Sequence, residues 1–178
     1  MPKSTFAGHP LHPMLIAAPA ALIPFAFVLD AMHRSTNDTS YSKAAYYSLV
    51  GGLIGGAAAA AAGVMDYLTI EPETEVKRTA NVHAILNGGV MALTAVNTLA
   101  RREAPSHRGG SLALTGLAAL GIVVSSWFGG HMVYEQGMRV KGVSPVEDAP
   151  ELKLPGDEKL GQAMHKVEHM ITASGPAE

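Results

Sequence analysis

Histidines are the residues of this chain whose type and spacing could do chemistry, and four of the eight stand out. His9 and His12 are three positions apart near the start of the chain, whereas His83 and His131 stand singly within long apolar stretches. Neutral imidazole is the commonest protein ligand for transition metals, and it also ligates haem iron. Ionisable side chains inside apolar segments of membrane length are costly and usually functional. These four histidines are therefore candidates for holding a cofactor.

The elements that must position the histidines are indicated by the distribution of charge. Four windows contain no Asp, Glu, Lys or Arg, namely Ser4–Leu29, Ala44–Met65, Thr79–Ala100 and Gly109–Tyr134. A membrane helix needs about 20 mostly apolar residues to cross about 30 Å of hydrocarbon. A soluble amphipathic helix would instead carry charges along an outer face. The sequence therefore predicts an all-α integral membrane protein, an up-down four-helix bundle formed by residues 1–138.

Prolines and the tail complete the expected organisation. The first helix is expected to begin near Pro10, where a missing N–H costs nothing, and to be kinked at Pro19 and Pro24. Residues 139–178 form a polar tail, in which apolar residues recur at helical spacing: Leu160, Met164, Val167 and Ile171. This pattern predicts a short amphipathic helix that lies on the membrane surface or covers the bundle.

Up-down topology predicts that the four histidines meet in one layer. The start of the first helix, the end of the second, the start of the third and the end of the fourth share one membrane face. Asp66, at the end of the second helix, belongs to the same layer. Because a carboxylate near a helix C-terminus opposes the helix dipole, Asp66 is expected to have a partner such as a histidine, Lys77 or Arg78.

Three interpretations of this layer are open. In the first, two histidines from different helices ligate haem b axially, with His83 and His131 as the first-choice pair. His9 and His12 would then be alternative ligands, a second site or orienting partners, and glycines would make room for the ring: Gly88, Gly89, Gly129 and Gly130. In the second, a single zinc, copper or iron ion is bound by the set His9, His12, His83, His131 and Asp66. In the third, the histidines are structural and form hydrogen bonds between helices.

Composition excludes several other classes. A net charge of −2 argues against a nucleic-acid-binding protein. The chain has no cysteine, which excludes disulfides, thiolate metal sites and cysteine nucleophiles. Walker, dinucleotide-binding and HExxH motifs do not occur in the sequence. If the protein is redox-active, it is therefore expected to be an electron carrier or a subunit of an oxidoreductase complex.

Four segments carry a resemblance to a known family: Gly8-His-Pro-Leu-His-Pro13, Gly63-Val-Met-Asp66-Tyr, Asn81-Val-His83-Ala-Ile-Leu-Asn87 and Ser126-Trp-Phe-Gly-Gly-His131-Met-Val-Tyr134. Over about residues 6–140 the chain resembles the bacterial membrane family called domain of unknown function 2231. The resemblance implies a four-helix membrane domain, sometimes joined to Rieske-type iron–sulfur domains. That association favours electron transfer and a b-type haem. Because this chain lacks cysteine, a partner would have to supply any iron–sulfur centre.

The expected surroundings follow from these interpretations. The expected partners are the lipid bilayer, a quinone or a redox protein, and a second copy of the chain. The second copy is expected because the glycines of the second helix could pack between copies as well as within one chain. These glycines are Gly51, Gly52, Gly55 and Gly56. The expected location is the bacterial inner (cytoplasmic) membrane. Basic residues are balanced between the two sides, so the positive-inside rule assigns no orientation. Acidic residues on the side of the termini favour an outward-facing position for that side.

Overall fold

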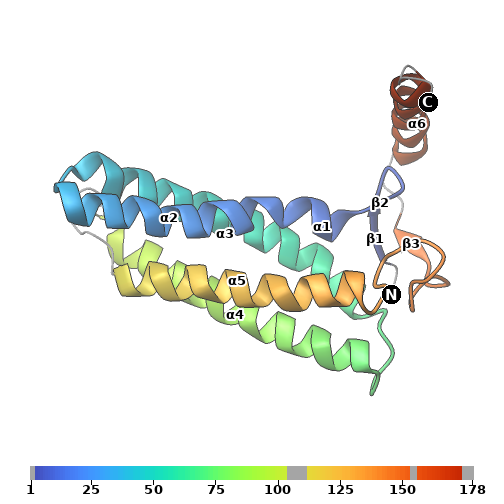
Figure 1. Ribbon diagram of the computed structural model, residues 1–178, viewed down its shortest axis with the longest axis horizontal. Helices are drawn as coiled ribbons and strands as arrows, with labels where there is room; N and C mark the ends of the chain where they lie inside the picture. Colours follow the sequence, from blue (N-terminus) through green and yellow to red (C-terminus); the bar gives the residue numbers. More distant parts are fainter. Residues whose placement is uncertain (1–2, 104–111, 153–155, 174–178) are drawn as a thin grey trace.

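A computed structural model describes residues 3–103, 112–152 and 156–173 of the chain. The first membrane span consists of α1 (Leu11–Leu15) and α2 (Ala17–Thr36). The other three spans are α3 (Thr39–Tyr67), α4 (Glu75–Arg101) and α5 (Leu112–Tyr134), and all four are long and apolar enough to cross a bilayer. Consecutive spans run in opposite directions along an elongated bundle (Figure 1). The predicted all-α, four-helix membrane fold is confirmed.

The first span is interrupted at a different place from the one expected. The interruption lies at Ile16, between α1 and α2, and Pro24 lies inside α2. Pro19 has no N–H to donate to the carbonyl of Leu15, so the helical ladder loses a hydrogen bond at this point. Helix-type bonds nevertheless continue on both sides, from Ile16 N to His12 O and from Ala20 N to Ile16 O. The break therefore falls about one turn before Pro19.

Small residues allow the spans to pack closely. Helix α2 contacts α3 and α5, and α4 contacts the same two helices, so each of these four helices packs against two neighbours. A Cβ atom added at Gly52 would lie 2.7 Å from the Ile23 side chain, and one at Gly55 would lie 2.6 Å from Ala18. The glycine track of α3 thus packs against the first span within one chain. Such close backbone approach is how small residues join helices in membranes.

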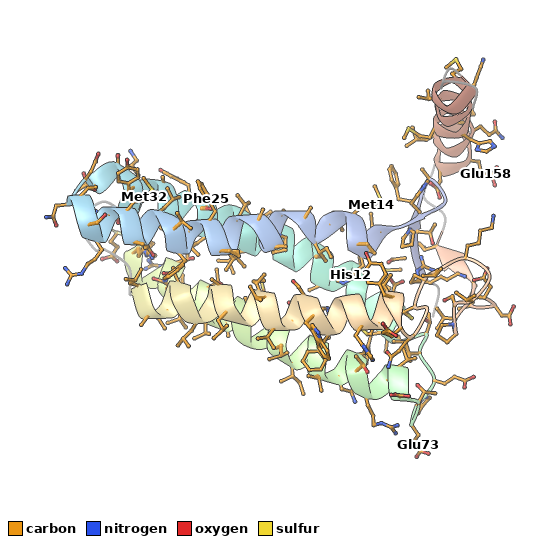
Figure 2. All side chains as sticks on the ribbon, in the orientation of Figure 1. His12, Met14, Phe25, Met32, Glu73 and Glu158 are labelled. Atoms are coloured by element: carbon orange, nitrogen blue, oxygen red, sulfur yellow. The ribbon has the colours of Figure 1, made fainter. Side chains whose placement is uncertain are left out.

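The outer surface of the bundle carries the large apolar side chains. Phe25 and Met32 project from α2 away from the other helices (Figure 2), and Ile54 and Val123 are similarly exposed on α3 and α5. A bundle that exposes large apolar residues along its length is suited to contact with lipid tails. The chain is therefore a multi-pass membrane protein in contact with the bilayer.

A small sheet at the end of the bundle was not predicted. Its strands are β1 (Lys3–Phe6), β2 (His9–Pro10) and β3 (Glu151–Leu152), in the order β2-β1-β3. The first pair is antiparallel, with Thr5 opposite Pro10, and the second is parallel, with Lys3 opposite Glu151. The segment that follows α5 therefore folds back onto the N-terminal strand.

The amphipathic helix expected in the tail is present as α6 (Asp157–Ala173). It lies beyond the sheet and extends across the long axis of the bundle rather than along it (Figure 1). Its first residue is buried, and the carboxylate of Asp157 accepts a hydrogen bond from the backbone N–H of Ala7. Helix α6 is thus attached to the turn between β1 and β2.

Candidate functional site

Two of the predicted histidines face each other inside the bundle, at the end that carries the sheet. His12 is the second residue of α1, and His83 lies in the third turn of α4. Their ring centroids are 6.4 Å apart, and the ring planes are nearly perpendicular at 88°. Figure 2 shows His12 pointing from α1 toward the other helices, whereas Met14 points outward. The layer predicted from topology therefore contains a real contact between two imidazoles.

The ring of His12 is held by α3. Its Nδ1 is 2.8 Å from the carbonyl oxygen of Ala59. One turn further along α3, a Cβ atom added at Gly63 would lie 2.9 Å from the same nitrogen. Because a carbonyl can only accept, Nδ1 of His12 carries a proton and donates it to Ala59. In the described part of the chain no group forms a hydrogen bond with Nε2 of His12.

The ring of His83 is held by α5 in a similar way. Its Nδ1 is 2.9 Å from the carbonyl oxygen of Ser125, and the Ser125 hydroxyl lies 3.0 Å from the same nitrogen. A Cβ atom added at Gly129 would lie 3.0 Å from the ring. Asn87, one turn along α4, places its amide nitrogen 3.0 Å from Nε2 and donates to it. His83 is therefore also the tautomer with the proton on Nδ1.

This pair of tautomers is the one that ligand histidines use. A histidine that binds a metal through Nε2 almost always donates its Nδ1–H to a carbonyl, a carboxylate or water, which fixes the ring and raises its basicity. Both His12 and His83 have this second partner already in place. The glycines Gly63 and Gly129 let the helix backbones approach the two rings closely. The site thus offers two oriented imidazoles from different helices.

His131 is not part of this pair. Its ring stacks on that of Trp127, with centroids 5.6 Å apart and planes at 13°. Ser125 and Gly129 form the face of α5 that meets His83, and His131 follows Gly129 by two residues, which turns it by about 200° around the helix. The structure therefore pairs His83 with His12, whereas the first-choice pair from the sequence was His83 with His131.

His9 also lies apart from the pair. It belongs to strand β2, is exposed, and its Nδ1 lies 2.9 Å from the carbonyl oxygen of Ala7 in the preceding turn. Because α1 begins only at Leu11, His9 and His12 belong to different elements, and their spacing of three does not place them on one face of a helix. Among the residues the structure describes, no group of three or more His, Asp or Glu side chains could hold one metal ion.

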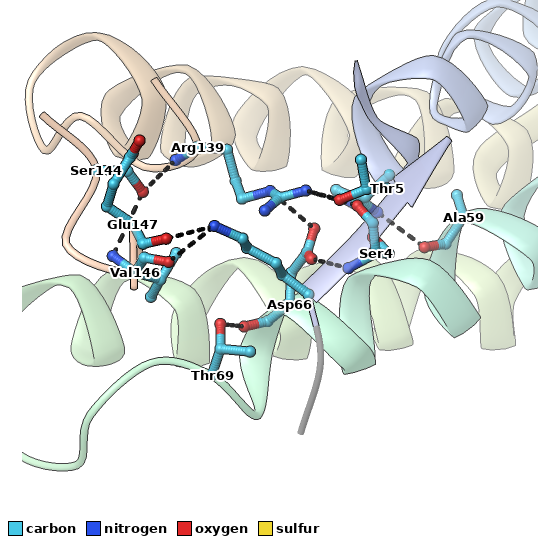
Figure 3. A network of polar contacts seen from close by, with 11 residues as sticks. Ser4, Thr5, Ala59, Asp66, Thr69, Arg139, Ser144, Val146 and Glu147 are labelled. Atoms are coloured by element: carbon cyan, nitrogen blue, oxygen red, sulfur yellow. Dashed lines mark hydrogen bonds and ion pairs between the residues drawn. The ribbon is translucent and has the colours of Figure 1, made fainter. Parts of the chain in front are cut away.

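Asp66 is buried in a separate polar network at the end of α3 (Figure 3). Its Oδ1 accepts the backbone N–H of Ser4 at 2.7 Å, and its Oδ2 lies 3.9 Å from Nε of Arg139. Arg139 also donates to the carbonyl of Ser4 at 2.6 Å and to the hydroxyl of Thr5 at 3.0 Å. Lys77, one of the partners expected for Asp66, instead donates to the carbonyl of Tyr67. Asp66 thus anchors strand β1 to the bundle.

Of the glycines expected to make room for a haem ring, Gly129 lies against His83, whereas nothing lies within 4 Å of a Cβ atom added at Gly88 or Gly89. Those two glycines therefore face open space outside the helix contacts. His107, which the sequence places at the opposite membrane face, lies outside the described residues.

A second polar cluster, at the opposite end of the bundle, escaped the sequence analysis. Arg101 donates two hydrogen bonds to the carboxylate of Asp30, at 2.9 and 2.6 Å, and a third to the side-chain oxygen of Asn97 at 3.0 Å. The hydroxyl of Thr115 donates to Asp30 at 3.0 Å. The four residues link α2, α4 and α5 in the interior. Their signal in the sequence was an acid and a base, Asp30 and Arg101, each the first charged residue after a charge-free window.

Comparison with known proteins agrees with this architecture. No curated protein and no solved structure matches the chain. The family described as predicted membrane protein, domain of unknown function 2231 (DUF2231), matches residues 8–142, which include all four spans and both histidines of the pair. This is more than half of the 178 residues. The chain belongs to the DUF2231 family of membrane proteins.

Proposed function

We propose that the protein is a b-type cytochrome-like electron carrier of the membrane, which binds haem through Nε2 of His12 and of His83. The observation that carries the proposal is the pair of adjacent imidazoles, whose rings make an edge contact and each donate Nδ1–H to a backbone carbonyl of a neighbouring helix. Haem iron can take its axial ligands from such imidazoles, and the cores of helix bundles commonly hold cofactors between facing helices. When bound, the haem would supply one-electron chemistry.

The number of candidate ligands favours haem over a single ion. A zinc site needs three or four protein ligands, whereas a porphyrin occupies four positions of its iron and leaves two for the protein. Two histidines in contact are the number that haem requires.

The side chain of Asn87 sets one condition for this proposal. Its amide now donates to Nε2 of His83, so it must rotate away for that nitrogen to ligate. The amide can still donate to the backbone carbonyl of His83, which lies 3.0 Å away. Asn87 would then contact only the α4 backbone, so its loss is expected to leave haem binding intact.

The alternative is a non-redox site for a single zinc, copper or iron ion, or a structural role in assembly. The observation that favours a single ion is the amide of Asn87, whose nitrogen lies 3.0 Å from Nε2 of His83. A flip of this amide would turn its oxygen toward an ion held at that nitrogen. Colour separates the two classes, since a haem protein is red and a zinc protein is colourless.

The proposed setting is the bacterial inner membrane. There the protein would be an electron carrier or a subunit of an oxidoreductase complex, and its electron partner would be a quinone or a redox protein. Contact of the four spans with lipid supports the membrane setting. The absence of cysteine means that an iron–sulfur centre ligated by thiolates would belong to a partner. Assembly with a second copy of the chain is part of the same proposal.

The test is the optical spectrum of detergent-purified protein from cells supplied with haem precursor, oxidised and then reduced, with metal analysis of the same sample. We expect a Soret band that is lost in His12→Ala and His83→Ala but kept in His131→Ala. His33→Ala is the matched control, because His33 makes the same Nδ1–carbonyl contact, to Asp38, at the other end of the bundle. Added imidazole should restore haem to His83→Ala, which separates a lost ligand from a lost fold.

Each other outcome selects a different interpretation. Haem retained in both His12→Ala and His83→Ala would overturn the assignment of the ligands. A colourless protein with one equivalent of zinc, copper or iron would establish the single-ion site. Neither haem nor metal in protein from haem-replete cells would leave the histidines with the structural role.

A further inference from the structure

We infer that α6 is an interfacial helix, which lies on the bilayer at the side of the termini with its apolar stripe among the lipid headgroups and upper acyl chains. The stripe comprises residues that recur every three or four positions: Leu160, Met164 and Val167. Their side chains are 40%, 54% and 44% exposed. In the described part of the chain nothing covers this stripe, although a stripe of this kind is expected to be buried against something apolar.

The attachment of α6 places it at the height of the membrane surface. Asp157, its first residue, accepts the backbone N–H of Ala7, and Gly161 lies one turn further against the backbone of the same residue. Ala7 precedes the first span, which begins at Leu11, by only four positions. The start of α6 is therefore fixed next to the point where the chain enters the bilayer.

The direction of α6 fits an interfacial position. The axis of the bundle must run across the membrane, because the four spans have that length and composition. Helix α6 extends across this axis (Figure 1), so it runs along the membrane plane rather than away from it. At the same edge of the bundle, Met14 and Ile16 expose their side chains to lipid. The apolar stripe is therefore beside a surface that already contacts the bilayer.

The charges of α6 indicate how it would bind. Residues 157–173 contain three acidic and two basic side chains, so attraction to anionic lipids does not drive the contact. Lys159 and Lys166 lie on one flank of α6, about 100° around the helix from the stripe, from which long side chains can reach water while their stems cover apolar surface. Burial of the stripe, rather than charge, is then the source of affinity. Replacing anionic lipid with neutral lipid should leave α6 in place.

The absence of cysteine allows a direct test in the full chain. Met164→Cys, on the stripe, and Gln162→Cys, on the opposite face, each receive a nitroxide label after reconstitution in phosphatidylcholine vesicles with and without phosphatidylglycerol. Collisions with oxygen report lipid, and collisions with a water-soluble nickel chelate report solvent. Ile54→Cys in mid-span is the lipid reference, and Glu73→Cys in the α3–α4 connection is the water reference.

We expect the Met164→Cys label to collide more with oxygen and less with the nickel chelate than the Glu73→Cys reference does, at a level between the two references, as an interfacial depth requires. The Gln162→Cys label should resemble the Glu73→Cys reference, and both results should hold in both lipid mixtures. Two labels that both behave like the water reference would overturn the proposal, since α6 would then be free in solution. A Met164→Cys label shielded from both reagents would also overturn it, since protein, either the bundle or a second copy of the chain, would then cover the stripe.

Discussion

The buried ion pair between Asp30 and Arg101 gives the sharpest test of how the bundle is held together at the end remote from the histidines. The two side chains are 2% and 1% exposed, and two hydrogen bonds join them. Asp30→Ala removes the carboxylate and leaves the guanidinium buried without its counter-charge. The hydroxyl of Thr115 loses its acceptor on Asp30 as well.

The expected magnitude follows from this geometry. Two unit charges about 4 Å apart attract by about 4 kcal/mol at an effective dielectric constant of 20. Removal of one partner of a buried pair typically costs about 3–5 kcal/mol, because the other charge stays uncompensated. We therefore expect Asp30→Ala to lower the free energy of unfolding by about 4 kcal/mol. The double variant Asp30→Leu/Arg101→Met should recover most of this loss, since it leaves no unpaired charge.

The assay is unfolding by SDS titration in mixed micelles, followed by circular dichroism. Glu103→Ala is the matched control: Glu103 faces Arg102 at 3.8 Å on the surface, with side chains that are 80% and 65% exposed. Its effect should stay within about 0.5 kcal/mol. A cost below about 1 kcal/mol for Asp30→Ala, or a double variant less stable than Asp30→Ala alone, would refute the reasoning.

Three further predictions concern the sheet end, a helix cap and the site. Gly129→Ala should push the His83 ring aside and reduce haem content in the optical spectrum, whereas Gly88→Ala, which meets open space, should not. Arg139→Ala should cost about 1–3 kcal/mol by leaving a buried carboxylate unpaired, and hydrogen exchange of β1 should rise above that of wild type. The backbone N–H that Asp38 caps at the start of α3 holds the pKa of its carboxyl below the usual range. The ionised Asp38 cap therefore stabilises the fold above the ordinary carboxyl pKa, and this stabilisation is lost as the pH falls through the lower pKa of the folded state. Asp38→Asn should remove this part of the pH dependence when the free energy of unfolding is measured against pH.

The spans were predictable because the bilayer constrains every residue that crosses it. A charged side chain in the hydrocarbon is costly, so charge-free windows coincide closely with the helices. The window Ala44–Met65 lies within α3, which begins at Thr39 and ends at Tyr67. The first window extends further, because the uncharged residues of β1 and β2 precede Leu11. Absence of charge alone does not distinguish a membrane helix from an uncharged strand beside it.

The pairing within the histidine layer was harder to predict, because depth in the membrane follows from sequence position but direction around a helix depends on packing. His83 and His131 lie in the same layer, yet only Ser125 and Gly129 on α5 face His83. The helical periodicity of α5 places His131 on a different face from Gly129. The sequence could therefore have excluded His131 as the partner of His83, had it been known that Gly129 faces His83. The break at Ile16, which sets the orientation of His12 in α1, depends on a hydrogen bond that Pro19 cannot make.

The sheet could not be read from the sequence, because its central strand pairs with residues from the far end of the chain. The Lys3 ammonium binds the carbonyl of Val146, 143 positions away, and neither strand has a length or pattern that signals pairing. Asp66 shows the same limit. Its partner Arg139 lies beyond the last span, whereas a histidine, Lys77 or Arg78 was expected.

The parallel pairing of β1 with β3 has a consequence for the order of assembly. Because β3 follows the last span, β1 cannot complete its pairing until all four spans have been synthesised and inserted. Lys3 binds the carbonyls of Val146 and Glu147, so this contact also waits for the last part of the chain. The end of the bundle beside His12 therefore remains open during biogenesis and closes last.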